Sequence, residues 1–530
     1  MEQSSESRKQ SAISSAAGEK DPFQQQLSWV ETRDAPAPAP SGKIVLREEE
    51  NWNRTAKAFS SKKKWWILTV VALCQTTMNY NAAVYSSAVG HLNEEYHLGS
   101  NHLTGARMGM VGMLVTYAFA CELWAPWSEE LGRWRIMQLS LGLVNIFQLL
   151  PALSTSWSMV IAGRVLIGFC SAGGSVTLGM VADMYDAEDQ QYSVLWVSLW
   201  SCLGALLGGV AGGPIEEFLP WRWNFYIQII FGVIVQTIHF FTVPETRSTV
   251  MLGNDARKRR KRNPNCNIYG PNEVKPFRER FALKEFVKLM WRPYHMLFFE
   301  PIVLFLSLLS GFADALIFSF LESYGFVYKQ WNFTPTGFSM AMIPLLIGYV
   351  AAYFSYFPVI KRHNRRRRDG DTSLTPESRL WWLLFIVPCL PIGILGSAFV
   401  SSGPPLPWIA PMIFGVFIGA ANWAIYFATI DYMVAAYGEK YAASATGGNG
   451  FARDLLAGLC ALYTKPMYDT LGIKKVTLLL FAVALMVCIP VYVFYWKGHQ
   501  IRARSKWAEK VKAEKEKAAI ARQRMQAHQV

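Results

Sequence analysis

Residues 158–183 of this chain read SMVIAGRVLIGFCSAGGSVTLGMVAD. This stretch is long enough to cross a bilayer as one helix, because about 20 apolar residues span the hydrocarbon core. It also places one charged side chain, Arg164, well inside the apolar run. Runs of similar length recur along the chain between shorter polar segments. The sequence therefore predicts an all-α membrane protein that crosses the bilayer many times.

The overall composition supports the same fold class. Of 530 residues, 52% are hydrophobic and only 17% are charged, too little charge to cover a soluble chain of this length. The net charge of +14 comes largely from basic residues beside the apolar runs, where they orient the chain and meet anionic lipid. This arrangement excludes nucleic acid as a partner and predicts a lipid bilayer instead.

The apolar runs number twelve, and a long polar stretch separates the first six from the last six. We expect spans at about 66–90, 105–126, 136–154, 158–183, 192–213, 223–243, 298–322, 337–358, 381–400, 408–433, 448–468 and 475–496. The expected organisation is a disordered tail (1–61), a first six-helix half (62–243), a basic central loop (244–296), a second six-helix half (297–496) and a charged tail (497–530).

Basic residues set the expected orientation, because Lys and Arg collect on the cytosolic side of membrane proteins. With both tails in the cytosol, that side receives Arg133, Arg135 and the Lys/Arg-rich stretches 247–292 and 361–379. The opposite side receives few basic residues, so the reverse topology would violate the rule. Within the central loop, residues 277–290 predict either an amphipathic helix on the membrane surface or a solvated linker.

Charged side chains inside the spans are the main functional signal. A charge at bilayer depth costs at least a few kcal/mol unless it is paired or faces water. The residues of this kind are Arg164, Asp314, Asp431, Arg453 and Asp454. Glu122, Glu300 and Glu322 lie nearer span ends, where side chains can reach the interface. Together these groups predict an aqueous cavity, a proton relay or internal ion pairs.

Small residues are concentrated in the fifth span. Gly204, Gly208 and Gly212 are four residues apart, so they share one helix face and allow a second helix to approach closely. Gly213 and Pro214 follow at a point where the span could bend. Plain helix packing and a moving joint are both compatible with this pattern.

No stretch of the sequence matches a catalytic or metal-binding motif such as HExxH, GxSxG or a phosphate-binding loop. We therefore expect neither an enzyme nor a metal site. Asn332 begins the N-x-T pattern Asn332-Phe333-Thr334 in a predicted outside loop, which makes it a candidate glycosylation site.

Several motifs resemble those of one family. Residues 125–135, APWSEELGRWR, look like the loop signature of the major facilitator superfamily. The Arg164-xxx-Gly168 segment resembles the superfamily's fourth-helix motif, and the glycine run of the fifth span is similar to its antiporter motif. Further similar segments are 221–225 (WRWNF), 244–247 (PETR), 376–380 (PESRL) and 431–432 (DY). The resemblance covers about 62–507 and is strongest to fungal twelve-span drug:proton antiporters.

The resemblance implies two six-helix halves that rock around a central cavity. It further implies proton-coupled efflux of small organic molecules, such as drugs, toxins or secondary metabolites. The expected protein is a plasma-membrane monomer with both termini cytosolic, driven by the proton gradient without a cofactor. A polyamine exporter, a proton-coupled importer of a nutrient or organic acid, and a non-transporting membrane sensor remain as alternatives.

The expected functional residues form two groups. Glu129, Gly132, Arg133 and Arg135 lie at the cytosolic end of the second span and form a candidate gate. In the cavity, we expect Asp314 to bind and release the proton with Arg164 as its counter-charge. Asp431 is the next candidate for coupling, and a permanent structural pair of Asp314 is the alternative.

Overall fold

The computed structural model describes residues 44–48, 50–98, 105–185, 190–263, 266–274, 283–369, 375–505 and 507. These residues are mostly helical, and their one sheet is a pair of two-residue strands. Residues 1–43 and 508–530, most of the two predicted tails, lie outside the described residues.

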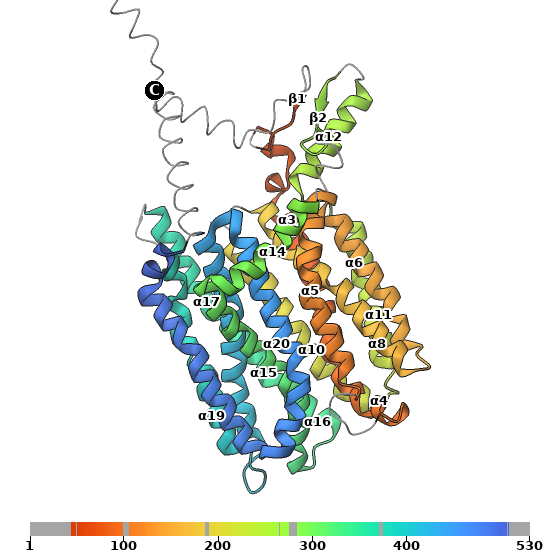
Figure 1. The fold of residues 1–530 in the computed structure, drawn as a ribbon, viewed down its shortest axis with the longest axis vertical. Coiled ribbons are helices and arrows are strands. Elements are labelled where there is room, and N and C mark those ends of the chain that lie inside the picture. The colour runs from red at the N-terminus through yellow and green to blue at the C-terminus, as the bar shows by residue number, and fades with distance from the viewer. Residues whose placement is uncertain are drawn as a thin grey trace, which may run out of the picture.

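Figure 1 shows long helices lying side by side in one bundle, with short elements at both ends. One end carries α12 (Ser248–Arg262), β1 (Ile44–Val45) and β2 (Ile268–Tyr269), and we name it the α12 end. The other end carries α4 (Val89–Glu95) and α16 (Pro335–Met340), and we name it the α16 end.

The first half of the bundle contains six passes between the two ends. They are α3 (Ser61–Val84) with η3 (Tyr85–Ala88); α5 (Met108–Leu131); α6 (Arg133–Phe147) with α7 (Leu149–Ala152); α8 (Trp157–Ser171) with η4 (Ala172–Ser175) and α9 (Val176–Met184); α10 (Gln191–Phe218); and α11 (Trp223–Thr242).

The second half begins with α14 (Leu283–Phe299) at the α12 end. Its passes are α15 (Pro301–Tyr328) with η5 (Lys329–Trp331); α17 (Ile343–Arg368); η6 (Pro376–Leu380) with α18 (Trp381–Ile386) and α19 (Cys389–Val400); and three helical segments within α20 (Ile409–Ala503). Gly438 (φ 62°) and Gly472 (φ 74°) separate these three segments, because a positive φ interrupts helical geometry and suits glycine.

The described residues therefore contain twelve helical passes at the positions of the twelve predicted spans. Nine described stretches are long and apolar enough to cross a membrane, and one of them, Tyr441–Ala503, contains two passes. These stretches account for ten passes, and the remaining two are the first pass (α3) and the third (α6 with α7). The fold class predicted from the sequence is confirmed.

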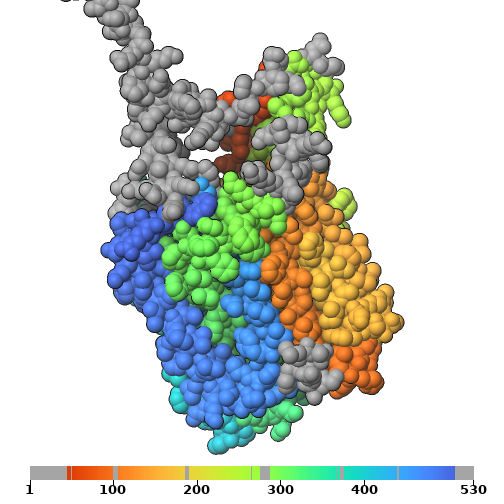
Figure 2. Space-filling model, viewed as in Figure 1, coloured from red at the N-terminus to blue at the C-terminus, as the bar shows by residue number. Residues whose placement is uncertain are grey.

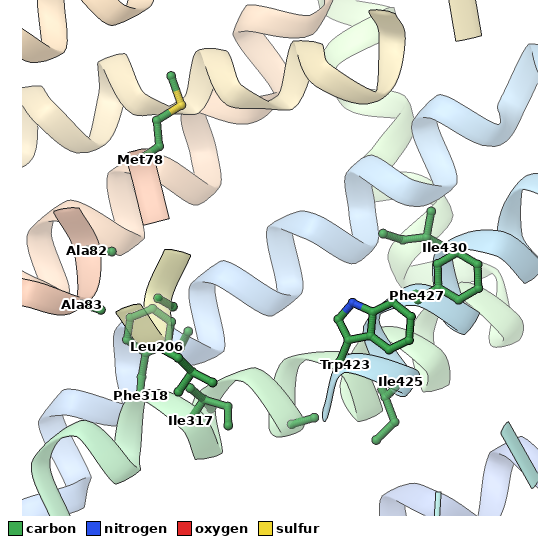
Figure 3. Close-up of a cluster of buried hydrophobic side chains, with 14 of the residues drawn as sticks. Met78, Ala82, Ala83, Leu206, Ile317, Phe318, Trp423, Ile425, Phe427 and Ile430 are labelled. Atoms are coloured by element: carbon green, nitrogen blue, oxygen red, sulfur yellow. The ribbon is translucent and has the colours of Figure 1, made fainter. Parts of the chain in front are cut away.

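Apolar side chains fill the interior and also cover the outside. Buried side chains from α3, α10, α15 and α20 converge in one cluster that joins both halves (Figure 3). On the outside, Phe241 is 78% exposed, Phe354 62% and Phe385 65%, and all three lie in stretches apolar enough to cross a membrane. Soluble monomers rarely expose so many large apolar groups, whereas lipid covers them without cost.

The predicted glycine stripe brings α10 close to α3. A Cβ atom at Gly204 would lie 2.6 Å from the carbonyl oxygen of Thr76, and one at Gly208 would lie 2.7 Å from that of Tyr80. Any larger residue would push the two helices apart. Pro214 lies inside α10, which continues as a helix to Phe218.

Residues 44–61 differ from the predicted disordered tail. β1 pairs in parallel with β2, η1 (Trp52–Arg54) and η2 (Ala56–Ala58) follow, and α3 begins at Ser61. Leu46 is buried against Leu252 and Ala256 of α12, which supplies the apolar contact that a two-residue strand pair needs. We call β1, β2 and α12 the clasp. Low hydrophobicity in the flanking tail concealed this short segment in the sequence.

Glu273 holds the clasp together electrostatically. Its carboxylate accepts hydrogen bonds from Arg257 (2.6 Å), from Arg260 (2.9 Å) and from the backbone N–H of Gly270 (3.0 Å). Burial alone would raise the pKa of Glu273, but the hydrogen bonds from Arg260, Gly270 and Arg257 lower it to about 2. This stabilisation is present above the ordinary pKa of 4.5 and is lost as the pH falls from there toward about 2.

We predict that Glu273→Gln opens the clasp, because the neutral amide loses charge-assisted hydrogen bonds worth about 1.5–3 kcal/mol each. Trypsin should then cleave within residues 257–262 about tenfold faster than in the wild type, as measured by mass spectrometry. Asp369→Asn is the control, because the side chain of Asp369 is 67% exposed and far from the clasp in sequence. Equal cleavage of wild type and Glu273→Gln would contradict the role of Glu273.

Candidate functional site

A small cavity lies between the two halves. Its volume is about 30 Å³, room for one or two water molecules. The lining residues are Met78, Asn79 and Ala82 of α3, Met113, Leu114 and Tyr117 of α5, Ser201, Cys202 and Ala205 of α10, Asp314, Ile317 and Phe318 of α15, Tyr349 of α17, and Arg453 and Asp454 of α20. Both halves therefore contribute to the lining of this cavity.

The charges of the cavity form one cluster around Arg453. Its guanidinium contacts Asp454 Oδ1 at 2.8 Å and Asp314 Oδ2 at 3.8 Å, and it lies over the ring of Tyr426. The side chain of Asp314 is 24% exposed, against 12% for Arg453 and 8% for Asp454. Asp314 is thus the most accessible and the most loosely paired carboxylate of the cluster.

Arg164 is not the partner of Asp314, contrary to the sequence-based prediction. It is fully buried in the first half, where it donates to Asn81 Oδ1 (3.0 Å) and to the carbonyl of Gly109 (3.3 Å). Its guanidinium also lies 4.3 Å from the ring centre of Tyr85. Arg164 therefore ties α8 to α3 and α5. The position of a charged residue within an apolar run indicates its depth in the membrane. It does not indicate which neighbouring helix the side chain faces.

Asp431 lies outside the cavity, toward the α12 end. It forms an ion pair with Arg379 of η6 and accepts a hydrogen bond from Tyr356 (3.3 Å). Gln191, the first residue of α10, donates to the same carboxylate at 3.4 Å. Because α10 belongs to the first half, Asp431 joins the two halves at the α12 end.

The predicted gate residues lie at the same end, and three of them share one network. Arg133 contacts Asp183 at 3.0 Å and Glu129 at 3.9 Å. The carboxylate of Glu245 accepts the backbone N–H of Arg133 (2.9 Å) at the start of α6, where a helix favours an anion. Gly132 has φ +105°, and a Cβ there would lie 2.3 Å from Glu245 Oε2, so only glycine fits.

Arg135 does not join this network. Its side chain is exposed, and it makes no hydrogen bond or ion pair among the described residues. Asp183 and Glu245, which the sequence analysis did not single out, take the partner positions. A search for a carboxylate at the end of the fourth span and for one just after the sixth would have found both.

The second half has a similar cluster at the α12 end. Glu377 of η6 forms two hydrogen bonds with Arg502 at 2.7 and 2.9 Å, next to the pair of Arg379 and Asp431. As in the first half, a short segment between two passes supplies charged groups to the ends of neighbouring helices. Each half therefore carries an ionic cluster at the same end of the bundle.

Two packing seams close the α12 side of the cavity. α5 lies along α20, where Phe119 contacts Phe451 with ring centres 5.0 Å apart. α10 lies along α17, where Tyr192 contacts Phe357 with ring centres 5.8 Å apart. Figure 2 shows the first seam as the boundary between the orange and blue surfaces, with α14 in green above it.

The α16 side is more open. A cavity of about 290 Å³ lies between the halves there, lined by Glu216, Glu322 and other residues. Arg107 of the first half contacts Glu322 of the second at 3.1 Å, so this end is held by an ion pair. A Cβ at Gly213 would lie 2.2 Å from the hydroxyl of Ser339 in α16, which shows how closely the halves approach. Exposed Asn332 also lies near this end, directly after η5.

Comparisons with known proteins identify the family. The model of the Major Facilitator Superfamily matches residues 67–461. The chain belongs to the major facilitator superfamily. It is therefore a membrane transporter and not an enzyme.

Similar superfamily members come from fungi. The chain is 29% identical over 472 residues to the MFS-type transporter paaT of Penicillium rubens, covering 88% of this chain and 83% of that protein. It is 27% identical to the MFS-type transporter kojT of Aspergillus flavus, covering 85% and 80%. It is 26% identical to the cycloheximide resistance protein of Candida maltosa, covering 86% and 83%.

A solved structure of the superfamily has the same fold. The human organic anion transporter MFSD10 (TETRAN) is similar with a TM-score of 0.54 and 16% identity, covering 81% of this chain and 99% of that chain. At this identity the similarity concerns the fold alone.

We predict that Arg133→Ala reduces transport at least about tenfold while the protein still reaches the membrane, because the variant removes the closer of the two arginines that pair with buried Asp183 and leaves only Arg247 at 3.4 Å. Arg135→Ala should behave as wild type, since Arg135 is exposed. Transport rates normalised to protein in the membrane would check both variants. If the two variants transport equally well, the Arg133 network is not a gate.

Proposed function

We propose that this protein exports small organic molecules across the plasma membrane in exchange for protons, with both tails in the cytosol. The observation that carries the proposal is the cluster of Asp314, Arg453 and Asp454 in the cavity between the halves. Two carboxylates share one guanidinium there, so the cluster can lose one negative charge and still keep an ion pair.

The basic residues support the orientation. The α12 end carries the run of basic side chains at the end of α12 and a second run at the end of α17. Positive residues favour the cytosolic side of a membrane. With the α12 end in the cytosol, the wider cavity at the α16 end opens toward the outside.

The geometry of the cluster supports proton exchange. In this conformation an ionised Asp314 is compensated by Arg453 at 3.8 Å. A proton that arrives from the α16 side neutralises Asp314 and leaves Arg453 paired with Asp454. When the halves rock and the cavity opens to the α12 side, Asp314 returns its proton to the cytosol, and the exported molecule moves in the opposite direction.

The cavity wall supports an organic substrate with apolar and aromatic parts. Tyr117, Phe318 and Tyr349 line it beside Met78 and Met113, and flexible methionine side chains adapt to ligands of different shape. One similar protein is named for cycloheximide resistance, so cycloheximide is a reasonable first probe. Because opposite halves supply the wall, a bound molecule would contact both and sense their movement.

We predict that Asp314→Asn abolishes proton-driven export, because the amide keeps the shape of the side chain but cannot cycle a proton. In yeast that lacks its own exporters, wild-type protein should confer resistance to cycloheximide or to other compounds of a toxin panel. A protonophore should remove this export. Asp314→Asn should lower the initial efflux rate at least about tenfold, equivalent to roughly 1.4 kcal/mol or more.

Asp369→Asn is the matched control for the same chemical change at an exposed site. Its efflux should equal that of wild type. If Asp314→Asn exports at the wild-type rate and still responds to the protonophore, Asp314 is not the coupling group, and Asp454 becomes the next candidate. Accumulation of panel compounds inside cells, rather than their loss, would identify an importer.

A further inference from the structure

Glu122 is a carboxyl group that the mechanism above does not use. The sequence suggested that its side chain reaches the membrane interface, but it is only 6% exposed. It lies on α5 and faces the second half, where a Cβ atom at Gly447 of α20 would come within 2.7 Å of Glu122 Oε1. Glu122 is therefore packed into the seam between α5 and α20.

This carboxyl group has no compensating partner. Glu122 Oε1 is buried without a hydrogen bond, and no hydrogen bond or ion pair joins Glu122 to any described residue. By contrast, Asp314 in the cavity lies beside Arg453. The two carboxyl groups thus sit in different electrostatic surroundings.

The ionisable groups around Glu122 do not change this conclusion. Cys121 precedes it on α5, and Tyr294 is near it on α14. The charged groups of the other helices packed on α5 have other surroundings: Arg133 pairs with Asp183, Arg164 donates to Asn81, Arg453 pairs with Asp454, and on α14 Arg292 donates to Ser444, Lys288 is exposed and the ring of His295 stacks on Phe299. No described cation is therefore positioned to neutralise an ionised Glu122.

An unpaired, buried carboxylate is costly, so Glu122 carries a proton while the seam is closed. The halves must separate along this seam when the cavity opens to the α12 side. Water then reaches Glu122, and a hydrated glutamate ionises at neutral pH. The proton is bound in one conformation and released in the other, so it shifts the equilibrium between them.

We propose that Glu122 is a proton-binding site that locks the seam between α5 and α20, so that acid on the α12 side closes the transporter at that end. The proposal rests on the alternating movement of the halves in the proposed function, but not on proton-driven export by Asp314. Glu122 exchanges its proton with the α12 side alone, whereas Asp314 lines the cavity. Glu122 therefore controls closure of the seam, and Asp314 couples proton movement to export.

Distance measurements between spin labels test the proposal without any substrate. Leu131→Cys on α5 and Lys361→Cys on α17 place labels at the α12 end of opposite halves, in a variant without the eight native cysteines. At about pH 5.5 the wild-type background should show the short distance, and at about pH 8.5 a longer one should appear. Glu122→Gln, which is always neutral, should keep the short distance at both pH values.

Glu94→Gln is the matched control, because Glu94 is exposed on α4 at the opposite end. It should follow the wild-type pH response. The open fraction at the higher pH should be at least about tenfold smaller in Glu122→Gln than in this control. A pH response of Glu122→Gln equal to that of the control, or no pH response in the control, would overturn the proposal.

Transport provides a second measurement if the cysteine-free protein does not fold. In vesicles whose α12 side faces the bath, downhill exchange of cycloheximide or another panel compound through Asp314→Asn protein should change with bath pH, and adding Glu122→Gln to that variant should make the exchange independent of bath pH. Asp314→Asn separates the two proposals. If Asp314→Asn no longer exports against a gradient but its seam still responds to pH, the proposal for Glu122 stands and only coupling at Asp314 is affected. If the protein exports against a gradient but its seam does not respond to pH, only the proposal for Glu122 fails.

Discussion

An uncompensated charge inside a bilayer costs several kcal/mol, and this cost determines where the charged side chains of the protein lie and what they contact. Arg164 survives at depth because Asn81, Gly109 and Tyr85 surround it. Arg453 survives because Asp454 and Asp314 flank it at the cavity. Arg164, held by backbone and neutral side chains, ties helices together, whereas in the proposed mechanism one of the two carboxylates that share Arg453 gains and loses a proton.

The same constraint explains the two ends of the bundle. Ionic clusters gather at the α12 end, where Arg133 meets Asp183 and Arg379 meets Asp431. The ion pairs of each cluster tie together helix ends within one half, and Gln191 adds a single hydrogen bond from the first half to Asp431. Among the described residues, fewer ion pairs join the two halves than tie helices within each half. The halves meet mainly through apolar seams and small residues. A transporter that rocks two rigid halves needs this division, because strong bonds within each half and few between halves permit movement as units.

Much of this arrangement could be predicted from the sequence, and the limits are physical. Apolar runs of about 20 residues give the number and depth of the passes, and the turn at Gly132 follows from its neighbours. A single charge in such a run does not reveal the rotation of its helix, so Arg164 was paired with the wrong partner and Glu122 was placed at the interface. The clasp was missed because Leu46 and its few apolar neighbours are too short a pattern to stand out from a polar tail.

The central claim is that movement of an organic molecule through this protein is tied to movement of a proton at Asp314. Purified protein in sealed liposomes with a trapped pH-sensitive dye tests it most directly. A gradient of an exported compound should drive protons in the opposite direction across liposomes that hold the wild type, and Asp314→Asn should remove that proton flux. Movement of the compound through the wild type without any change in internal pH would contradict the account.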